Sequence, residues 1–391
     1  MRTIQIPTER KGHLAYYQDK AEIDQAIQRV LDHGHYVMGP EVPAFEAEFA
    51  AYCDAAYSVA VTSGTTSLHI ALLALELGPD DEVLTVAGGD LAPSLAVLHT
   101  GAQLTWVDIC EETLNMDPAS LRDTLSAKTR AVIAVDMYGA PADMDALRDA
   151  LDGRDDITLI EDFSLAVGAT YRGKKAGSLA DIGCTSLAAG KVLGVLGSGG
   201  ALTTHHEHLY RRINEVRHYG RAESPYWHDD PLPPVKEPDG MVIKGLNERM
   251  DSIQAAVARV KLRHLERDLG IRRAIAAVYD EYLKAAPCRA QRVLDQAVSS
   301  YRSYVILVEP QIRDQFVQKM AEAGIRVGLQ YIPPDHLHPY FLERGCQPGM
   351  LPVIEKVADA LACLPIEPTM SVEDVHYVAE TARKLLFDLS G

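Results

Sequence analysis

The sequence predicts an α/β fold, with a mostly parallel sheet sandwiched by helices and a smaller C-terminal α+β domain. Strand and helix patterns alternate from about residue 58 to residue 204. Several strand segments are nearly continuous apolar runs, as expected for strands buried on both faces. Beyond residue 204 the pattern becomes mainly helical. We therefore expect a large domain at 1–250, followed by a linking helix and a small domain at 251–391.

The large domain contains seven predicted strands. They are 58–63, 82–87, 103–109, 130–137, 157–162, 183–188 and 200–204. The segment after the first strand has helical spacing and is expected to end at Gly78, before Pro79. Four apolar residues share one face of this helix: Leu68, Ala71, Leu72 and Leu75.

After residue 204, the predicted helices and strands follow a different order. Helices are expected at 209–220, 248–269, 311–325 and 372–389, and strands at 300–309 and 327–332. The helix at 248–269 is the one that we expect to link the two domains.

Composition excludes several classes of function. The chain has 391 residues, 47% hydrophobic and 24% charged, which is typical of a globular protein. A formal net charge of -17 without any basic run argues against nucleic-acid partners. Residues 1–17 lack the apolar core of a signal peptide, and no apolar run is long enough to span a membrane. Six scattered cysteines predict neither a zinc site nor disulfides. We expect a cytoplasmic protein without metal or membrane partners.

A candidate anion site follows the first strand. The stretch VTSGTTSL places hydroxyl residues on both sides of Gly64 at a helix start, where backbone N–H groups have no intrahelical acceptor. Ser63, Thr65 and Thr66 suit a phosphate, although they are also residues that cap helices. The two uses are compatible.

A pair of acids ends the fifth predicted strand, in LIEDFSLAVGA. Successive strand side chains point to opposite faces, so only one of Glu161 and Asp162 can enter a cleft. A carboxylate buried there needs a partner, because an unpaired buried charge costs several kcal/mol. Either a structural ion pair, a helix cap or a protonated ring nitrogen of a ligand would satisfy that need.

Lys191 stands alone in SLAAGKVLGVLGSGG, a stretch that is otherwise small or apolar. Small neighbours leave room for a planar ligand, and low polarity lowers the pKa of an amine, which a Schiff-base lysine requires. A solvated surface lysine is the alternative. Together, a phosphate site, a strand-end aspartate and a lysine are what pyridoxal phosphate needs for its phosphate, ring nitrogen and aldehyde.

Longer motifs carry a resemblance to a known family. They include GHYVMGPEVPAFEAEF, SGTTSLHIALLAL, YGAPADMDAL, GLNERMDSIQAA and YIPPDHLHPYF, besides the stretch from Ile160 to Ser186. The chain resembles, nearly end to end, the DegT/StrS sugar aminotransferases, which have the fold-type I architecture of pyridoxal phosphate enzymes. This resemblance implies a homodimer whose subunits share their active sites.

The resemblance also implies residue roles. Lys191 would bind the cofactor covalently and then move protons, and Asp162 would hold the pyridinium. The remaining implied cofactor residues are Gly64, Thr65, Thr66, Asp90, Ser186 and, toward the neighbouring subunit's phosphate, Asn247. Tyr36, Tyr331 and His336 lie in segments that border the substrate pocket.

The sequence departs from the family pattern around the cofactor ring. Asp90 occupies the usual position of an aromatic residue that stacks on the cofactor, and Asp136 replaces a common His. Leu165 and Val167 replace the familiar Gln and His. Thr185 and Leu187 stand where Phe is customary. Asp90 is either a turn residue after two glycines or a polar group that an unusual substrate requires.

These observations predict a pyridoxal phosphate-dependent aminotransferase. Its substrates would be a keto sugar, nucleotide-linked, or a keto cyclitol, with an amino acid such as glutamate as donor, in antibiotic or cell-surface glycan biosynthesis. A lyase, dehydratase or cyclase of the same fold is one alternative. A protein that binds the cofactor as a sensor or structural ligand is another. For a diphosphate substrate, Arg217, Arg221 or Lys244 would supply positive charge.

Overall fold

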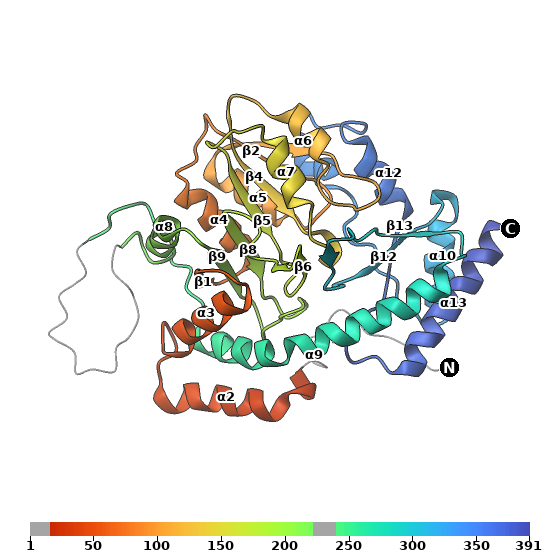
Figure 1. Cartoon of the computed structure of the whole chain (residues 1–391), viewed down its shortest axis with the longest axis horizontal. Coiled ribbons are helices and arrows are strands. Elements are labelled where there is room, and N and C mark those ends of the chain that lie inside the picture. The colour runs from red at the N-terminus through yellow and green to blue at the C-terminus, as the bar shows by residue number, and fades with distance from the viewer. Residues whose placement is uncertain (1–15, 222–239) are drawn as a thin grey trace.

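The computed structural model describes residues 16–221 and 240–391, and its centre is a seven-stranded sheet (Figure 1). The strand order is β1-β9-β8-β5-β4-β2-β3, and only β9 runs antiparallel to its neighbours. The strands are β1 Tyr57–Val61, β2 Glu82–Val86, β3 Gln103–Val107, β4 Thr129–Val135, β5 Thr158–Asp162, β8 Ile182–Ser186 and β9 Gly200–Thr204. This confirms the predicted mostly parallel sheet and the seven strands predicted between residues 58 and 204.

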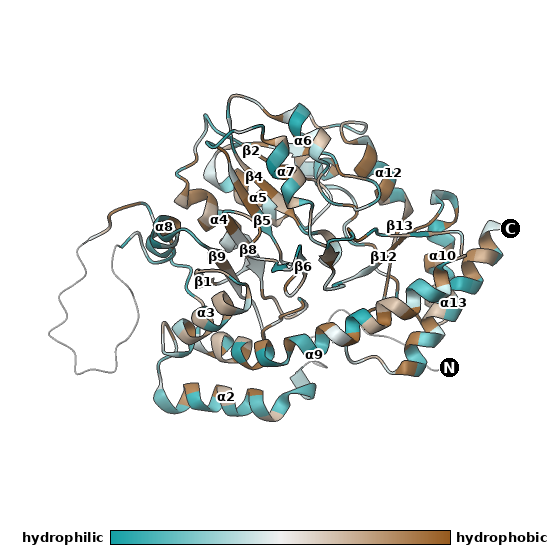
Figure 2. Ribbon diagram, in the orientation of Figure 1, coloured by the Kyte–Doolittle hydropathy of each residue, from teal (hydrophilic) through white to brown (hydrophobic). Residues whose placement is uncertain are grey.

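Helices cover both faces of this sheet because side chains alternate along its buried strands. In β4, Ala131 and Ile133 pack with α4, α5 and α8, whereas Val132 and Ala134 pack with α6, α7 and α12. The central strands are accordingly hydrophobic (Figure 2). These helices are α4 Gly64–Ala74, α5 Ala92–Thr100, α6 Pro118–Thr124, α7 Met144–Ala150, α8 Glu207–Arg217 and α12 Pro352–Ala360.

One long helix, α9 Ser252–Leu283, connects the sheet to the C-terminal part (Figure 1). Its first half packs with α2 Lys20–His33 and α3 Glu41–Tyr52, and its second half packs with α10 Pro310–Glu322 and α13 Val372–Ser390. The side chain of Asp251 caps it by accepting a hydrogen bond from the N–H of Gln254 (2.8 Å). A boundary near residue 250 between two domains stays a prediction.

The C-terminal part contains a small antiparallel sheet in the order β10-β12-β13. Its strands are β10 Arg289–Ala290, β12 Tyr304–Leu307 and β13 Leu361–Leu364. A third small sheet, β11-β6-β7, joins β11 Ala297–Val298 to a hairpin of β6 Thr170–Tyr171 and β7 Lys174–Lys175. Short elements η2 Met137–Gly139, η3 Asp335–Leu337 and α11 Pro339–Leu342 complete the described chain.

Two sequence predictions are wrong in detail. The segment 327–332 is not a strand: only Gly328 forms a bridge, with Cys363, and the partner of β12 is β13 instead. The helix α4 ends at Ala74 rather than at Gly78, with Leu75 as its C-cap. The prediction for residues 1–15 lies outside the described residues. Within 16–221 and 240–391, no helix is both long enough and apolar enough to cross a bilayer.

Candidate active site

A cavity of about 210 Å³ lies where several parallel strands end. Chains of this topology bind ligands outside the carboxyl ends of their strands. The lining residues are Ser63, Gly64, Thr65, Asp90, Ala92, Val135, Asp162, Ser164, Leu165, Ser186, Ala188, Lys191 and Tyr331. The structure therefore brings together most of the predicted cofactor residues, which come from four separate strand ends.

The start of α4 forms one end of the cavity. Ser63 caps the helix by accepting a hydrogen bond from the N–H of Thr66 (3.1 Å), so its use as a cap is real. The N–H groups of Gly64 and Thr65 lie in the first turn, where a helix offers no acceptor. Gly64 also lies against β8, since a Cβ built on it would be 2.5 Å from the Cβ of Ser186. Only glycine allows this close approach. The hydroxyl groups of Thr65 and Ser186 therefore lie near N–H groups of the first helical turn, which have no acceptor within the helix.

Asp162 ends β5 and enters the cavity, as the alternation of side chains predicted. Its Oδ1 accepts a hydrogen bond from the N–H of Ser164 (3.0 Å), and the Oγ of Ser164 accepts one from the N–H of Ser186 (2.8 Å). Burial raises the pKa of Asp162, and the hydrogen bonds from Ser164 oppose this rise. A cation bound against Asp162 would keep it ionised. Sequence reasoning missed Ser164, although a Ser two residues after an Asp is a common turn pattern.

Glu161 points to the other side of the sheet, where it is fully buried. It accepts hydrogen bonds from the N–H groups of Gly177 (3.0 Å) and Leu179 (3.1 Å). Asp136 is also fully buried and accepts a hydrogen bond from the N–H of Ala142 (2.8 Å). Burial and the charge of Glu161 raise the pKa of Asp136 well above its usual value, and burial raises that of Glu161 to about 7.

Lys191 lines the same cavity and is partly buried. Burial lowers the pKa of its ammonium, and the charge of Arg302 lowers it further, whereas Asp162 and Asp90 raise it. An amine with a lowered pKa is a better nucleophile and proton acceptor at neutral pH. The predicted reason for a lysine in this apolar stretch is thus consistent with its surroundings.

The rest of the lining is less typical of the family. Asp90 is exposed at the cavity and follows β2, and Leu165 contributes an apolar side chain. Tyr331 supplies an aromatic ring, and this ring stacks on Tyr138 at 6.4 Å between centroids. Val167 is fully buried in the core formed with α9, away from the cavity lining.

Four predicted site residues do not line this cavity. Thr66 bonds through its hydroxyl to Ser63 (2.9 Å), and Tyr36 and Asn247 are exposed. His336 is fully buried, with Nε2 2.9 Å from a carboxylate oxygen of Glu355. Their roles toward substrate or a second subunit stay predictions.

Arg217 does not offer a free positive charge for a substrate phosphate. It is fully buried and pairs with Glu46 and Asn214, since its guanidinium anchors the end of α8. The expectation that Arg217 contributes to a basic pocket is therefore wrong. Arg221 lies over the ring of Tyr219 instead, at 5.6 Å.

The residues present fit pyridoxal phosphate. Free N–H groups and hydroxyls at α4 suit its phosphate, buried Asp162 suits a protonated ring nitrogen, and Lys191 suits its aldehyde. These three groups line one cavity of about 210 Å³.

Comparisons with known proteins agree with this assignment. The model of the DegT/DnrJ/EryC1/StrS aminotransferase family matches residues 17–383. The chain belongs to this family. Its members include the erythromycin biosynthesis sensory transduction protein EryC1 of Saccharopolyspora erythraea, 38% identical over 94% of this chain and 96% of that protein. The dTDP-3-amino-3,4,6-trideoxy-alpha-D-glucose transaminase of Streptomyces venezuelae is 36% identical, over 95% and 93%.

Solved structures of the DegT/DnrJ/EryC1/StrS family share the fold. DesV of S. venezuelae, solved in complex with a ketimine intermediate, matches with a TM-score of 0.88 at 35% identity, covering 95% of this chain and 96% of that one. NtdA of Bacillus subtilis, solved with bound pyridoxamine phosphate, matches with a TM-score of 0.87 at 26% identity, covering 99% and 86%. The protein is a fold-type I aminotransferase that uses pyridoxal phosphate, as the sequence predicted.

Proposed function

We propose that this aminotransferase converts a keto sugar, carried on a nucleoside diphosphate, to the amino sugar, with glutamate as amino donor. The observation that carries the proposal is that Lys191, Asp162 and the start of α4 line one cavity. The S. venezuelae relative, named for a dTDP-linked amino sugar, supports the substrate class. A keto cyclitol is the second candidate substrate, and the product would enter an antibiotic or a cell-surface glycan.

Each residue has a defined task in this proposal. When bound, pyridoxal phosphate supplies an aldehyde for the donor amine and a ring that accepts electrons. Asp162 keeps a proton on the ring nitrogen through a charge-assisted hydrogen bond worth roughly 1.5–3 kcal/mol. The Nζ of Lys191 takes a proton from the donor carbon and returns it, a role that its lowered pKa favours. Gly64, Thr65 and Ser186 hold the phosphate.

We also propose a homodimer that completes the site. Asn247 and Tyr36 are exposed and lie outside the cavity of their own chain, which fits a role toward a second subunit. Size-exclusion chromatography with light scattering checks the dimer. Cofactor retention in Asn247→Ala protein checks the shared site.

Absorbance spectroscopy tests the reaction. Glutamate added to the cofactor-loaded protein should convert bound pyridoxal phosphate to pyridoxamine phosphate, with one 2-oxoglutarate formed per site. Adding dTDP- or UDP-linked keto sugars should then restore the original spectrum and yield an amino sugar by mass spectrometry. Absence of conversion with every amino donor would contradict transamination and favour the sensor or the lyase. Restoration only by a keto cyclitol would exclude the nucleotide-linked substrate.

A further inference from the structure

Arg302 is a buried cation without an ion-pair partner in the described part of the chain. The residue is only 8% exposed, and its Nε has no hydrogen-bond partner. Among the described residues, no carboxylate forms an ion pair with its guanidinium. A buried unpaired charge is costly and is retained in few places. Arg302 differs in this respect from the neighbouring Arg272, which bonds to Glu367 (2.7 Å) and to the carbonyl of Ile366 (2.7 Å).

The backbone around Arg302 is fixed beside the candidate active site. The N–H of Ser300 donates to the carbonyl of Gly139 (2.9 Å), and that of Ser303 donates to the carbonyl of Tyr138 (3.1 Å). Both acceptors lie in η2, directly after β4. The guanidinium in turn lies close to the lysine loop, with an NH2 nitrogen 3.9 Å from a Cβ built on Gly190. Hydrogen bonds to η2 therefore fix the segment that carries Arg302, and its guanidinium lies beside the loop that carries Lys191.

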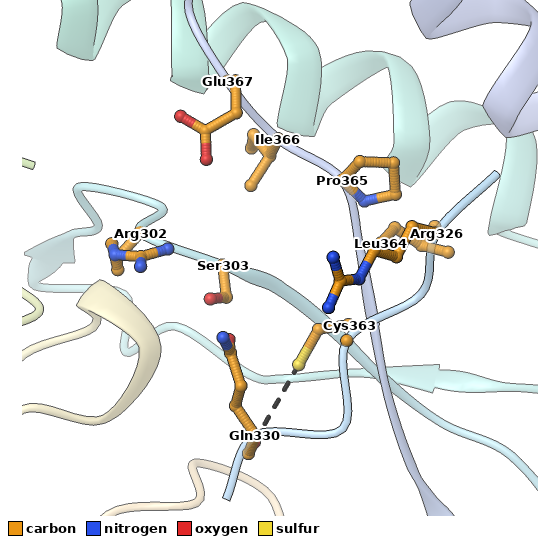
Figure 3. Close-up of a pocket in the computed structure, with 10 residues that line it drawn as sticks. Arg302, Ser303, Arg326, Gln330, Cys363, Leu364, Pro365, Ile366 and Glu367 are labelled. Atoms are coloured by element: carbon orange, nitrogen blue, oxygen red, sulfur yellow. Dashed lines mark hydrogen bonds between the residues drawn. The ribbon is translucent and has the colours of Figure 1, made fainter. Parts of the chain in front are cut away.

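Arg302 also lines a small cavity of about 60 Å³ (Figure 3). A second arginine, Arg326, lines the cavity from the other side, and the amide of Gln330 lies between them in Figure 3. The carboxylate in the lining, Glu367, is engaged by Arg272. The volume is enough for several water-sized groups, so a carboxylate fits. Two guanidinium groups in one cavity favour an anion with more than one carboxylate.

We propose that Arg302 binds the α-carboxylate of the amino donor and that Arg326 binds the distal carboxylate of a dicarboxylic donor. The proposal rests on the proposed transamination, because it places the donor carbon beside Lys191. Arg302 forms the fork-to-fork contact that guanidinium makes with carboxylate, and its buried charge is neutralised only when the donor arrives. Arg326, which is exposed, selects glutamate over donors with uncharged side chains.

Binding of glutarate to the cofactor-loaded protein tests the site without requiring turnover. Glutarate has both carboxylates and no amine, so it occupies the site but does not react. By calorimetry, Arg302→Gln should weaken glutarate binding about 10- to 100-fold, the value of a charged hydrogen-bonded contact. Arg302→Lys should recover part of the loss. The control Arg289→Gln removes a surface arginine paired with Glu111 (3.0 Å) and should bind glutarate like the parent protein.

Two further measurements separate binding from a structural role. Replacing Arg302 breaks no ion pair among the described residues. The melting temperature of Arg302→Gln should therefore be no lower than that of the parent protein. The parent should bind glutarate more tightly than butyrate, and Arg326→Gln should lose this preference. Unchanged glutarate binding in Arg302→Gln, or a strongly lowered melting temperature, would overturn the proposal. Glutarate binding through Arg302 without any reaction of glutamate would support the carboxylate site and reject transamination.

Discussion

Two groups of residues around one cavity agree with the family pattern to different extents. The cofactor group, Gly64, Thr65, Asp162, Ser186 and Lys191, has the residue types that the family pattern requires. The altered group, Asp90, Leu165 and, beside the cavity, Asp136, does not. The chemistry of one cofactor fixes the first group, because phosphate, ring nitrogen and aldehyde each need one kind of partner. No such requirement applies to the second group, of which Asp90 and Leu165 line the cavity and Asp136 is fully buried.

Among tests of the two groups, the largest effect on the reaction rate is expected from Lys191→Ala. Loss of the amine removes both the covalent attachment and the proton transfer, so the rate should fall at least about 10²–10⁴-fold. Borohydride reduction of cofactor-loaded protein followed by peptide mass spectrometry measures the attachment. Lys356→Ala, which removes a surface lysine paired with Glu111 (2.8 Å), should retain label and activity. A covalent label in the Lys191→Ala protein would contradict the assignment.

The second largest effect on the cofactor group is expected from Gly64→Ala. The new Cβ would lie 2.5 Å from the Cβ of Ser186 and 2.9 Å from its Cα, which forces the start of α4 away from β8. Overpacking of this kind costs about 1–3 kcal/mol. We expect this cost to weaken the binding of pyridoxal phosphate. Equilibrium dialysis against free cofactor measures it. Gly78→Ala is the matched control, since nothing lies within 4 Å of its Cβ. Equal retention in both variants would remove the argument for close approach.

Asp136→Asn tests the altered group through pH. The pKa of Asp136 is raised in the folded state, so folding takes up a proton and stability falls as pH rises from about 4 toward the folded pKa. Asn carries no such proton. The stability of the variant relative to the parent should therefore increase as the pH rises above about 4, by no more than about 1.4 kcal/mol per pH unit.

Urea unfolding at several pH values measures this difference. Asp123→Asn, at an exposed position of α6, should follow the parent at every pH. A constant difference between the Asp136→Asn variant and the parent would mean that Asp136 is ionised in the folded protein.

The smallest effect is expected from Asp90→Phe. A ring at this exposed position should stack on the cofactor and strengthen its retention by about 0.5–1.5 kcal/mol. Amination of the ketone should be lost at the same time if Asp90 contacts the substrate, whereas the reaction with glutamate should continue. Separate measurement of the two half-reactions decides between these roles. Unchanged retention and unchanged amination would identify Asp90 as a turn residue.

The large sheet was predictable because its strands are buried on both faces and read as apolar runs. The strands of the C-terminal part were harder to predict. Residues 327–332 have a strand-like composition, yet they lead into the cavity at Tyr331, and β13 takes the place beside β12. Short strands such as β6 and β7, Thr170–Tyr171 and Lys174–Lys175, have too few residues for any periodicity. Their pairing depends on contacts distant in sequence.

The site shows the same division. Lys191 and Asp162 were predictable, since a lone cation among small residues and an acid after an apolar run stand out. Arg302 was not, because an arginine near the start of a predicted strand resembles many surface arginines until its burial and its lack of an ion-pair partner among the described residues are known. Arg217 was misjudged for the opposite reason, as its partner Glu46 lies far away in the chain.

The sequence by itself determined the kinds of chemistry present: a phosphate site, an acid for a ring nitrogen, an amine, and the family to which they belong. Only the tertiary structure decided which acids meet and which charges are paired. Asp136 lies close to Glu161, and Arg217 pairs with Glu46. Within residues 16–221 and 240–391, Arg302 has no ion-pair partner and lies beside the Lys191 loop. The physical reason is that residue type sets what a group can bind, whereas burial and distance, which set its pKa and its cost, exist only once the chain has folded.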